Sequence, residues 1–290
     1  MKRKPALGAT LLAGALITAI AGTAPAFAAG HHARGLDYVA LGDSYASAPV
    51  VPTQVDAACA RSDHNYPSLV AAAKKATLTD VSCSGATTAD MTAPQGSVPP
   101  QFAALDRHTD LVTVTIGGND IGFSTILGTC AQLTATDPAG APCQAHFTSG
   151  GTDQLKQVID RTAPKVAKVL RGIQARAPHA RVLLVGYPDL FPNDGVGCTS
   201  QTTPFAAGDF AYMRDTEKRL NGMLARTAAW NHAGYVDTNT PTIGHDMCQL
   251  PADRWIENLA PASPAAPAHP NALGEQAMAK ATARHLAAHR

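Results

Sequence analysis

The chain has 290 residues, of which 45% are hydrophobic and 16% are charged, and its formal net charge at pH 7 is +1. This length and apolar content are ample for a large buried core. Beyond the N-terminal segment no run of Lys and Arg occurs, which argues against a nucleic-acid partner because such proteins gather cations that face phosphates.

The N-terminal segment has the form of a secretory signal, with three cations at residues 2–4 and an apolar stretch from residue 7 to about residue 27. Its most apolar part, residues 11–20, is shorter than the about 20 residues that a membrane-spanning helix needs. Cleavage after Ala28 would remove three cations and no acid, so the formal charge would change from +1 to −2. We therefore expect a signal peptide at residues 1–28, one domain at 29–290, and a secreted, extracellular monomer with no membrane anchor.

Six cysteines follow this segment, and in an oxidising compartment they are expected to form three disulfides. The sequence alone does not choose among the possible connectivities, and pairing neighbours along the chain is the simplest. No Cys-x-x-Cys spacing or close His/Cys cluster indicates a metal site, and we expect no cofactor. The pairs expected on this basis are Cys59–Cys83, Cys130–Cys143 and Cys198–Cys248.

Short apolar runs alternate with helical patterns along the rest of the chain. Continuous apolar runs suit strands that are buried on both faces of a parallel sheet. The alternation predicts a three-layer α/β/α sandwich with a central parallel sheet of about five strands. The expected strands are Tyr38–Leu41, Leu78–Cys83, Leu111–Ile116, Val182–Val185 and Tyr235–Asp237.

Three helices are expected from apolar residues at helical spacing. The first follows Thr152 or Asp153 as N-cap and runs to Ile173, and Pro164 should kink or split it. The second carries an apolar stripe from Phe210 to Trp230, which we place in the core. The third starts near Asn271 and reaches Leu286.

Two further segments are expected to lack helices and strands. Residues 124–151 are rich in Gly, Pro and Thr and contain Cys130 and Cys143, which indicates a disulfide-stapled surface loop. Residues 260–270 contain four prolines and are expected to be extended and rigid.

Polar residues or glycines follow three of the predicted strands, and a histidine precedes the last helix. Ser44 follows the first strand, Gly85 the second and Asn119 the third, whereas His269 stands before Pro270 and Asn271. In a parallel sheet such strand ends share one edge, so these residues can converge there. Each alone is ordinary turn composition, but together they supply a nucleophile, a base and oxyanion donors for acyl transfer.

This ordered set resembles the SGNH hydrolases, also called GDSL esterases and lipases, especially their secreted actinobacterial branch. The resemblance covers nearly all of the mature chain and implies the flavodoxin-like SGNH hydrolase fold. It implies that Ser44 is the nucleophile and His269 the general base. It also implies that the backbone N–H groups of Ser44 and Gly85 and the side-chain amide of Asn119 form the oxyanion hole.

The chain departs from the family pattern beside the histidine, because Ala266 stands where the family usually has an aspartate, three residues earlier. Two interpretations follow. The backbone carbonyl of Ala266, held by Pro264 and Pro267, can orient the imidazole, or an acid such as Asp246 can reach it from elsewhere. We favour the carbonyl, because the second ring nitrogen needs a positioned acceptor.

Three smaller features bear on the same site. His245, beside an aspartate, is a rival for the base, although the His-Pro-Asn context favours His269. Tyr45 replaces the leucine of the GDSL motif, and Ala48 stands where relatives often have glycine. Asp43 is interpreted as a turn residue rather than as a catalytic acid.

We expect a serine esterase or lipase that hydrolyses carboxylic esters of lipids or other alcohols through an acyl-enzyme. A phospholipase A is one form that such an enzyme can take. A carbohydrate acetyl esterase and a catalytically inactive secreted binding protein on the same scaffold remain alternatives. A nucleotide-binding module is disfavoured because no Gly-x-x-x-x-Gly-Lys loop occurs. The candidate residues for an acyl groove are Ile121, Phe123, Leu127 and Phe205.

Overall fold

The computed structural model describes residues 35–193 and 195–288. The expected signal peptide, residues 1–28, lies outside the described residues. Among the helices of the described part, none combines the length and the apolar character that crossing a membrane requires.

A parallel sheet of five strands forms the centre of the fold, in the order β4-β1-β5-β6-β7. The expected parallel sheet is confirmed, and the middle strand is buried along its whole length, as its continuous apolar run predicts. The second strand ends earlier than predicted, because Asp80 accepts from the backbone N–H of Ser82 and turns the chain. The strands are β1 (Asp37–Gly42), β4 (Thr77–Asp80), β5 (Leu111–Thr115), β6 (Arg181–Val185) and β7 (Gly234–Val236).

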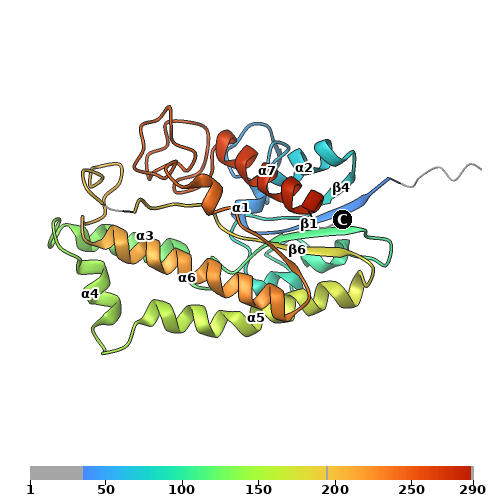
Figure 1. Ribbon diagram of the computed structural model, residues 1–290, viewed down its shortest axis with the longest axis horizontal. Helices are drawn as coiled ribbons and strands as arrows, with labels where there is room; N and C mark the ends of the chain where they lie inside the picture. Colours follow the sequence, from blue (N-terminus) through green and yellow to red (C-terminus); the bar gives the residue numbers. More distant parts are fainter. Residues whose placement is uncertain (1–34, 194, 289–290) are drawn as a thin grey trace, which may run out of the picture. The chain divides into compact units, whose positions relative to one another are not determined.

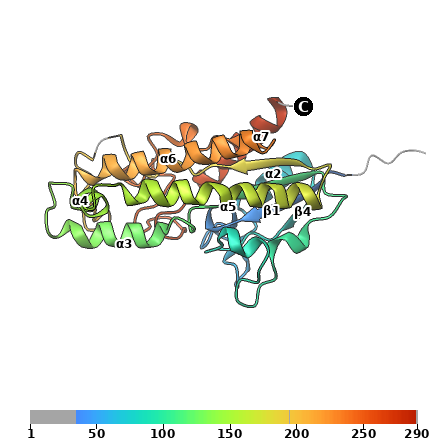
Figure 2. The ribbon, with the colours of Figure 1, turned by 90° about the horizontal axis from the view of Figure 1, so that it is seen from below.

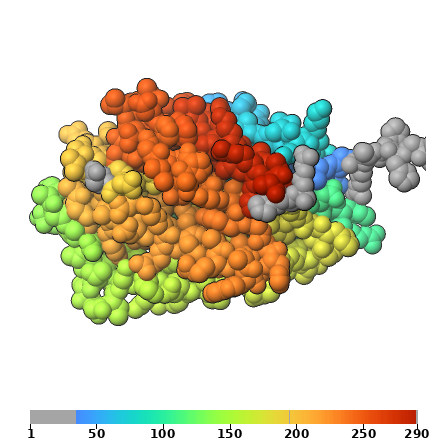
Figure 3. Space-filling model, viewed as in Figure 1, coloured from blue at the N-terminus to red at the C-terminus, as the bar shows by residue number. Residues whose placement is uncertain are grey.

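Helices cover both faces of the sheet (Figures 1 and 2). On one face α2 (Tyr66–Lys74) packs against α7 (Ala272–Ala288), and on the other α5 (Gln154–Arg176) packs against α6 (Asp209–Trp230). The predicted three-layer α/β/α sandwich is thereby confirmed. Figure 3 shows that the loop between β7 and α7 lies at the surface beside α7.

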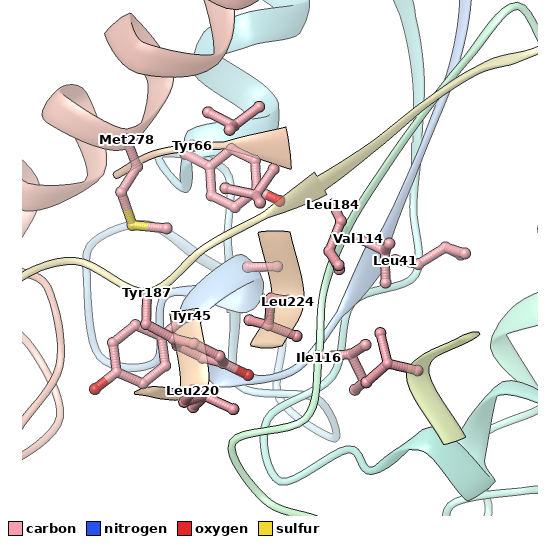
Figure 4. Close-up of a cluster of buried hydrophobic side chains, with 14 of the residues drawn as sticks. Leu41, Tyr45, Tyr66, Val114, Ile116, Leu184, Tyr187, Leu220, Leu224 and Met278 are labelled. Atoms are coloured by element: carbon pink, nitrogen blue, oxygen red, sulfur yellow. The ribbon is translucent and has the colours of Figure 1, made fainter. Parts of the chain in front are cut away.

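The core fills the space between the sheet and its helices (Figure 4). Apolar side chains of the three central strands point to both faces, because successive residues of a strand alternate. The labelled members of this core are Leu41, Tyr45, Tyr66, Val114, Ile116, Leu184, Tyr187, Leu220, Leu224 and Met278.

The predicted loop at residues 124–151 is wrong, because two helices occupy most of it. They are α3 (Phe123–Thr134) and α4 (Pro142–Thr148). One face of α3 is buried through Ile126, Leu127 and Cys130, a helical spacing that the surrounding Gly, Pro and Thr conceal. The short α4 depends on a tertiary contact, since the carboxylate of Asp209 accepts from two of its first backbone N–H groups, both at 2.9 Å.

Three other expectations need correction. Pro164 does not split α5, which runs unbroken past it because the proline lies on the exposed side, where water can satisfy the freed carbonyl. Trp230 is not in the core, because this last residue of α6 is 78% exposed. Residues 260–270 form bends and turns rather than an extended segment.

The structure contains three disulfides, each between cysteines that are neighbours in chain order: Cys59–Cys83, Cys130–Cys143 and Cys198–Cys248. The first lies beside the site, because Ser84 donates its N–H to the carbonyl of Cys59 at 2.9 Å. This bridge therefore holds the loop that carries Gly85. Two short strands, β2 (Gln54–Asp56) and β3 (Arg61–Ser62), form a separate antiparallel pair that the sequence did not predict.

Candidate active site

Ser44 is the first residue of the short helix α1 (Ser44–Ser47), two residues after β1 ends at Gly42. The turn between them requires glycine at Gly42, where φ is +143° and a Cβ would lie 2.6 Å from the carbonyl oxygen of Thr115. Asp43 is the N-cap of α1, and its carboxylate accepts from the N–H of Tyr45 at 3.0 Å. The hydroxyl of Ser44 is thereby held at the carboxyl edge of the sheet.

His269 meets this hydroxyl across 225 residues of sequence, with Nε2 at 2.7 Å from Oγ of Ser44. The other ring nitrogen, Nδ1, lies 2.8 Å from the backbone carbonyl oxygen of Pro267. A carbonyl can only accept, so in the neutral ring Nδ1 carries the proton and Nε2 is free to accept from the serine hydroxyl. The pair thus has the tautomer that a nucleophile and its base require.

The predicted acceptor for the imidazole, the carbonyl of Ala266, is wrong by one residue. That carbonyl accepts instead from the backbone N–H of His269 at 3.2 Å and so closes a turn. Ala268 then takes a left-handed conformation, with φ at +60°, and the chain reverses so that the Pro267 carbonyl faces the ring. A backbone carbonyl orients the histidine, as expected, but it belongs to Pro267.

The two rival residues lie in contacts of their own. The carboxylate of Asp246 accepts from the N–H of Cys248 at 2.9 Å and from the side-chain amide of Gln249 at 3.1 Å. The ring of His245 stacks on Trp255 with centroids 3.5 Å apart, and its Nδ1 donates to the carbonyl of Asp253 at 2.6 Å. These contacts hold both residues within the loop that precedes α7.

The two other predicted residues belong to neighbouring loops. Gly85 has φ at +82°, a conformation that glycine adopts without strain. Asn119 donates one side-chain N–H to the carbonyl of Ala86 at 2.9 Å, which joins the loop after β5 to the loop after β4. Since an amide nitrogen carries two N–H groups, the second can donate to another acceptor. The neighbouring Asp120 strengthens this link, because its carboxylate accepts from the hydroxyl of Thr88 at 2.6 Å.

A pocket opens beside Ser44 and Asn119 and holds about 640 Å³ of empty space, its open mouth included. Its walls are mainly apolar side chains of α3, α6 and the segment after β6, which suits a hydrocarbon chain. Of the four predicted groove residues, Ile121, Phe123 and Leu127 line it. Phe205 does not, because it is fully buried and packs edge-on against Phe191 and Phe210.

The comparison with known families accounts for this combination of fold and site. The model of the GDSL-like lipase/acylhydrolase family matches residues 40–277. The chain belongs to this family. Lipase 2 of Streptomyces coelicolor is 43% identical over 256 residues, which cover 85% of this chain and 84% of that protein.

Two solved structures resemble this GDSL family member over 88% of its chain and 100% of theirs. They are the phospholipase A1 of Streptomyces albidoflavus NA297, with 28% identity, and the extracellular lipase of Streptomyces rimosus, with 30% identity. Both superpose with a TM-score of 0.70. These relatives confirm the resemblance to the SGNH hydrolases, and their source in Streptomyces fits the actinobacterial branch.

Tyr45, which replaces the leucine of the GDSL motif, makes contacts that a leucine could not make. Its hydroxyl donates to the carbonyl of Ala268 at 2.6 Å, directly before the histidine. Its ring stacks on the imidazole of His269, with centroids 4.7 Å apart and planes inclined by 29°. This tyrosine therefore supports both the turn and the ring plane of the histidine. At the end of α1, Ala48 has φ at +56°, which explains why relatives often have glycine there.

Tyr187 is a buried residue of the site that the sequence analysis missed. Its hydroxyl accepts from the N–H of Gly118 at 2.7 Å and donates to the carboxylate of Asp43 at 2.6 Å. It thus ties the turn before Ser44 to the turn before Asn119, and its ring contacts Tyr45 edge-on at 5.0 Å (Figure 4). The signal was present, because this tyrosine follows β6 at the same carboxyl edge as the other site residues.

Asp43 is electrostatically unusual for a turn residue. Burial raises the pKa of its carboxyl to about 7, although the hydrogen bonds from Tyr187 and from the N–H of Tyr45 oppose the shift. Its two oxygens are committed to these two donors, at 2.6 and 3.0 Å. Asp43 therefore fixes the turns around Ser44, in agreement with its interpretation as a turn residue.

Proposed function

We propose that this carboxylic ester hydrolase is a secreted serine esterase or lipase in which Ser44 forms an acyl-enzyme. The observation that carries the proposal is the 2.7 Å contact between Oγ of Ser44 and Nε2 of His269, with Nδ1 held by a carbonyl. His269 takes the serine proton as Oγ attacks the ester carbonyl carbon. It then gives that proton to the departing alkoxide. Water next attacks the acyl-enzyme, with His269 taking the proton of the water and returning it to Oγ of Ser44 as the acid leaves.

The oxyanion of the tetrahedral intermediate would be held by three donors. These are the backbone N–H groups of Ser44 and Gly85 and the free side-chain N–H of Asn119. They are positioned by the caps, turns and cross-loop bonds around Asp43, Tyr187 and Ala86 before the substrate arrives. Donors fixed in this way need no reorganisation as charge develops, which is the largest source of stabilisation in many such sites.

The acyl part of the ester would lie in the apolar pocket beside Ser44. The apolar walls of this pocket, among them Ile121, Phe123 and Leu127, suit a hydrocarbon chain better than the polar ring of an acetylated sugar. This favours a lipase or phospholipase over the carbohydrate acetyl esterase. The retained Ser–His contact disfavours the inactive binding protein.

Secretion is supported by the signal-like residues 1–28, by three disulfides and by the solved relative that is an extracellular lipase. We expect the mature enzyme to act as a monomer without a cofactor. Detection of the chain in culture medium, cleaved after Ala28, would test the secretion.

The proposal is tested by turnover and by labelling of the purified protein. It should hydrolyse p-nitrophenyl butyrate, and a serine-reactive phosphonate should inactivate it with one adduct per chain. Peptide mass spectrometry should place the adduct on Ser44. An adduct on another residue, or a protein that neither turns over nor reacts, would exclude this mechanism.

Asn119→Ala is expected to lower kcat by about 100- to 1000-fold, because losing one oxyanion donor costs about 2.7–4 kcal/mol in the transition state. The KM should change little, since the neutral ester gains less from that donor. Asn119→Asp keeps the shape but replaces the donor by an acceptor, so it should be at least as impaired. A loss of kcat below about tenfold in both variants would show that Asn119 is not an oxyanion donor.

The acidic limb of the pH–rate profile should lie below the usual pKa of histidine. Burial lowers the pKa of His269, and the smaller effect of its bond to the Pro267 carbonyl opposes the shift. The base acts in its neutral form, which a lowered pKa preserves to lower pH. The profile of kcat/KM should therefore fall only below about pH 6.5. A midpoint near pH 7.5 would instead indicate a carboxylate partner.

A further inference from the structure

The loop after β4 carries Gly85 in a tight turn. The N–H of Ala86 closes the turn by donating to the carbonyl of Cys83 at 3.1 Å. Gly85 stands at the third of the four positions with φ at +82°, as a type II turn requires. Turns of types I and II differ in the orientation of their central peptide, which here joins Ser84 to Gly85. The turn type therefore decides in which direction the N–H of Gly85 points.

A side chain holds this central peptide from one side. Because a trans peptide is planar, the carbonyl of Ser84 and the N–H of Gly85 point in opposite directions. Nε2 of Gln95 donates to the carbonyl oxygen of Ser84 at 2.8 Å, and no other donor among the described residues does so. Gly85 is exposed, and its N–H donates to no acceptor in the described part of the chain. Gln95 thus fixes the direction of an N–H that a substrate can reach.

The other backbone donor of the expected oxyanion hole is held in a different way. The peptide between Asp43 and Ser44 has its carbonyl at the start of α1, where it accepts from the N–H groups of Ala46 and Ser47, both at 3.0 Å. Backbone bonds of the helix therefore fix the N–H of Ser44. The peptide of Gly85 belongs to no helix, so its direction depends on one side chain.

Gln95 is itself held in place at both ends. Its backbone exchanges two hydrogen bonds with that of Val98, both at 3.0 Å, around a tight turn in which Gly96 has φ at +62°. At the other end a carbonyl oxygen can only accept, so the oxygen of Ser84 must face Nε2. Oε1 is buried and has no partner among the described residues. The bond to Ser84 is therefore what orients this side chain.

We propose that Gln95 is a positioning residue of the oxyanion hole, which holds the Ser84–Gly85 peptide so that the N–H of Gly85 faces the ester oxygen. The inference rests on the proposed function and adds a residue that acts through Gly85. The same bond polarises the peptide, which strengthens its N–H as a donor. Its effect should appear in the transition state, where the ester oxygen gains charge, rather than in the binding of the neutral ester.

Gln95→Met tests this role by removing the amide while keeping the length of the side chain. We expect kcat for p-nitrophenyl butyrate to fall about 3- to 15-fold, the range in which one hydrogen bond can bias the peptide, with KM changed by less than about twofold. Gln95→Glu should lose about 10- to 100-fold at a pH where the carboxylate is ionised, because two acceptors would then face each other. A loss of kcat below about twofold in both variants would overturn the proposal.

The matched control is Gln174→Met, which removes the same kind of bond far from the site. Nε2 of Gln174 donates to the backbone carbonyl of Asn231 at 2.6 Å. Asn231 precedes β7, so this bond lies at the opposite edge of the parallel sheet from Ser44. Gln174→Met should leave kcat unchanged. Equal losses of kcat in Gln95→Met and Gln174→Met would overturn the proposal, by making the effect one of stability.

Gly85→Ala acts on the same peptide from its other side. A methyl group there would meet only Nε2 of Gln95, at 3.5 Å, so space is available, but a residue with a Cβ disfavours φ of +82°. This variant should turn the peptide and lower kcat about 10- to 100-fold. Because both changes act through one N–H, kcat of Gln95→Met/Gly85→Ala should lie within about threefold of that of Gly85→Ala. Multiplied losses in the double variant would overturn the proposal.

Thermal unfolding of every variant shows that it is folded before its rate is compared. Failure of the proposed function gives a different result from failure of this inference. In the first case the native enzyme hydrolyses the ester no faster than Ser44→Ala, which overturns both. In the second case native turnover is intact and the Gln95 variants equal it.

Discussion

Replacing Ser44 with alanine is expected to lower kcat for p-nitrophenyl butyrate by roughly five to six orders of magnitude. Without Oγ no acyl-enzyme can form, and only the oxyanion donors and substrate binding remain to accelerate attack by water. The fold should persist, because alanine fits the same space and Asp43 still caps α1. We expect the free energy of unfolding to change by less than about 1 kcal/mol.

Ser47→Ala is the matched control for this variant. Ser47 is buried in the same short helix, three residues further on, and its hydroxyl has no hydrogen-bond partner among the described residues. Its removal should leave kcat unchanged. Burst kinetics and thermal unfolding of both variants would separate loss of the nucleophile from loss of structure. Residual turnover within about a hundredfold of the native rate in Ser44→Ala would show that another group attacks the ester.

Replacing His269 with alanine is expected to lower kcat by a similar factor, roughly four to six orders of magnitude. The proton of Ser44 then has no acceptor at 2.7 Å, and the leaving alkoxide has no acid. Because the two residues act as one unit, the double variant Ser44→Ala/His269→Ala should be no slower than the worse of the single variants. A multiplicative loss in the double variant would show that they act independently.

Two controls separate His269 from the residues that compete with it in the sequence. His245→Ala should retain activity, because the ring of His245 stacks on Trp255, whereas the ring that contacts Ser44 is that of His269. Asp246→Asn should also retain most activity, since the Pro267 carbonyl and not this carboxylate holds the imidazole. A fall of several orders of magnitude in Asp246→Asn would refute the Ser–His dyad with a carbonyl acceptor.

The dyad has a chemical consequence that a triad would not share. A neutral carbonyl orients the imidazole but stabilises its protonated form less than a carboxylate does. Tyr45 holds the imidazole in place, because its ring stacks on that of His269 and its hydroxyl donates to the carbonyl of Ala268. Positioning and the oxyanion donors would then carry most of the rate, in keeping with how much of the acceleration such donors supply in serine hydrolases.

Much of the fold could be predicted because its signals are local. Continuous apolar runs predict the strands. A run such as Leu111–Ile116 can be buried on both faces only in a sheet that is covered on both sides. Helices with a clear stripe, as at Phe210, were found for the same reason. The helix at residues 123–134 was missed because Gly, Pro and Thr in the segment conceal its apolar spacing. The helix at residues 142–148 was missed because the residue that accepts from its first N–H groups, Asp209, is remote in sequence.

The candidate site divides along the same line. The sequence by itself determined which groups are present, a hydroxyl, an imidazole, a carboxamide and glycines at strand ends, because residue type and order along the chain suffice for that. The tertiary structure alone decided that Pro267 orients the histidine and that Tyr187 joins the two turns. Such contacts depend on where a reversing chain aims a carbonyl or a phenol, and this is set by packing between distant segments rather than by any neighbouring residue.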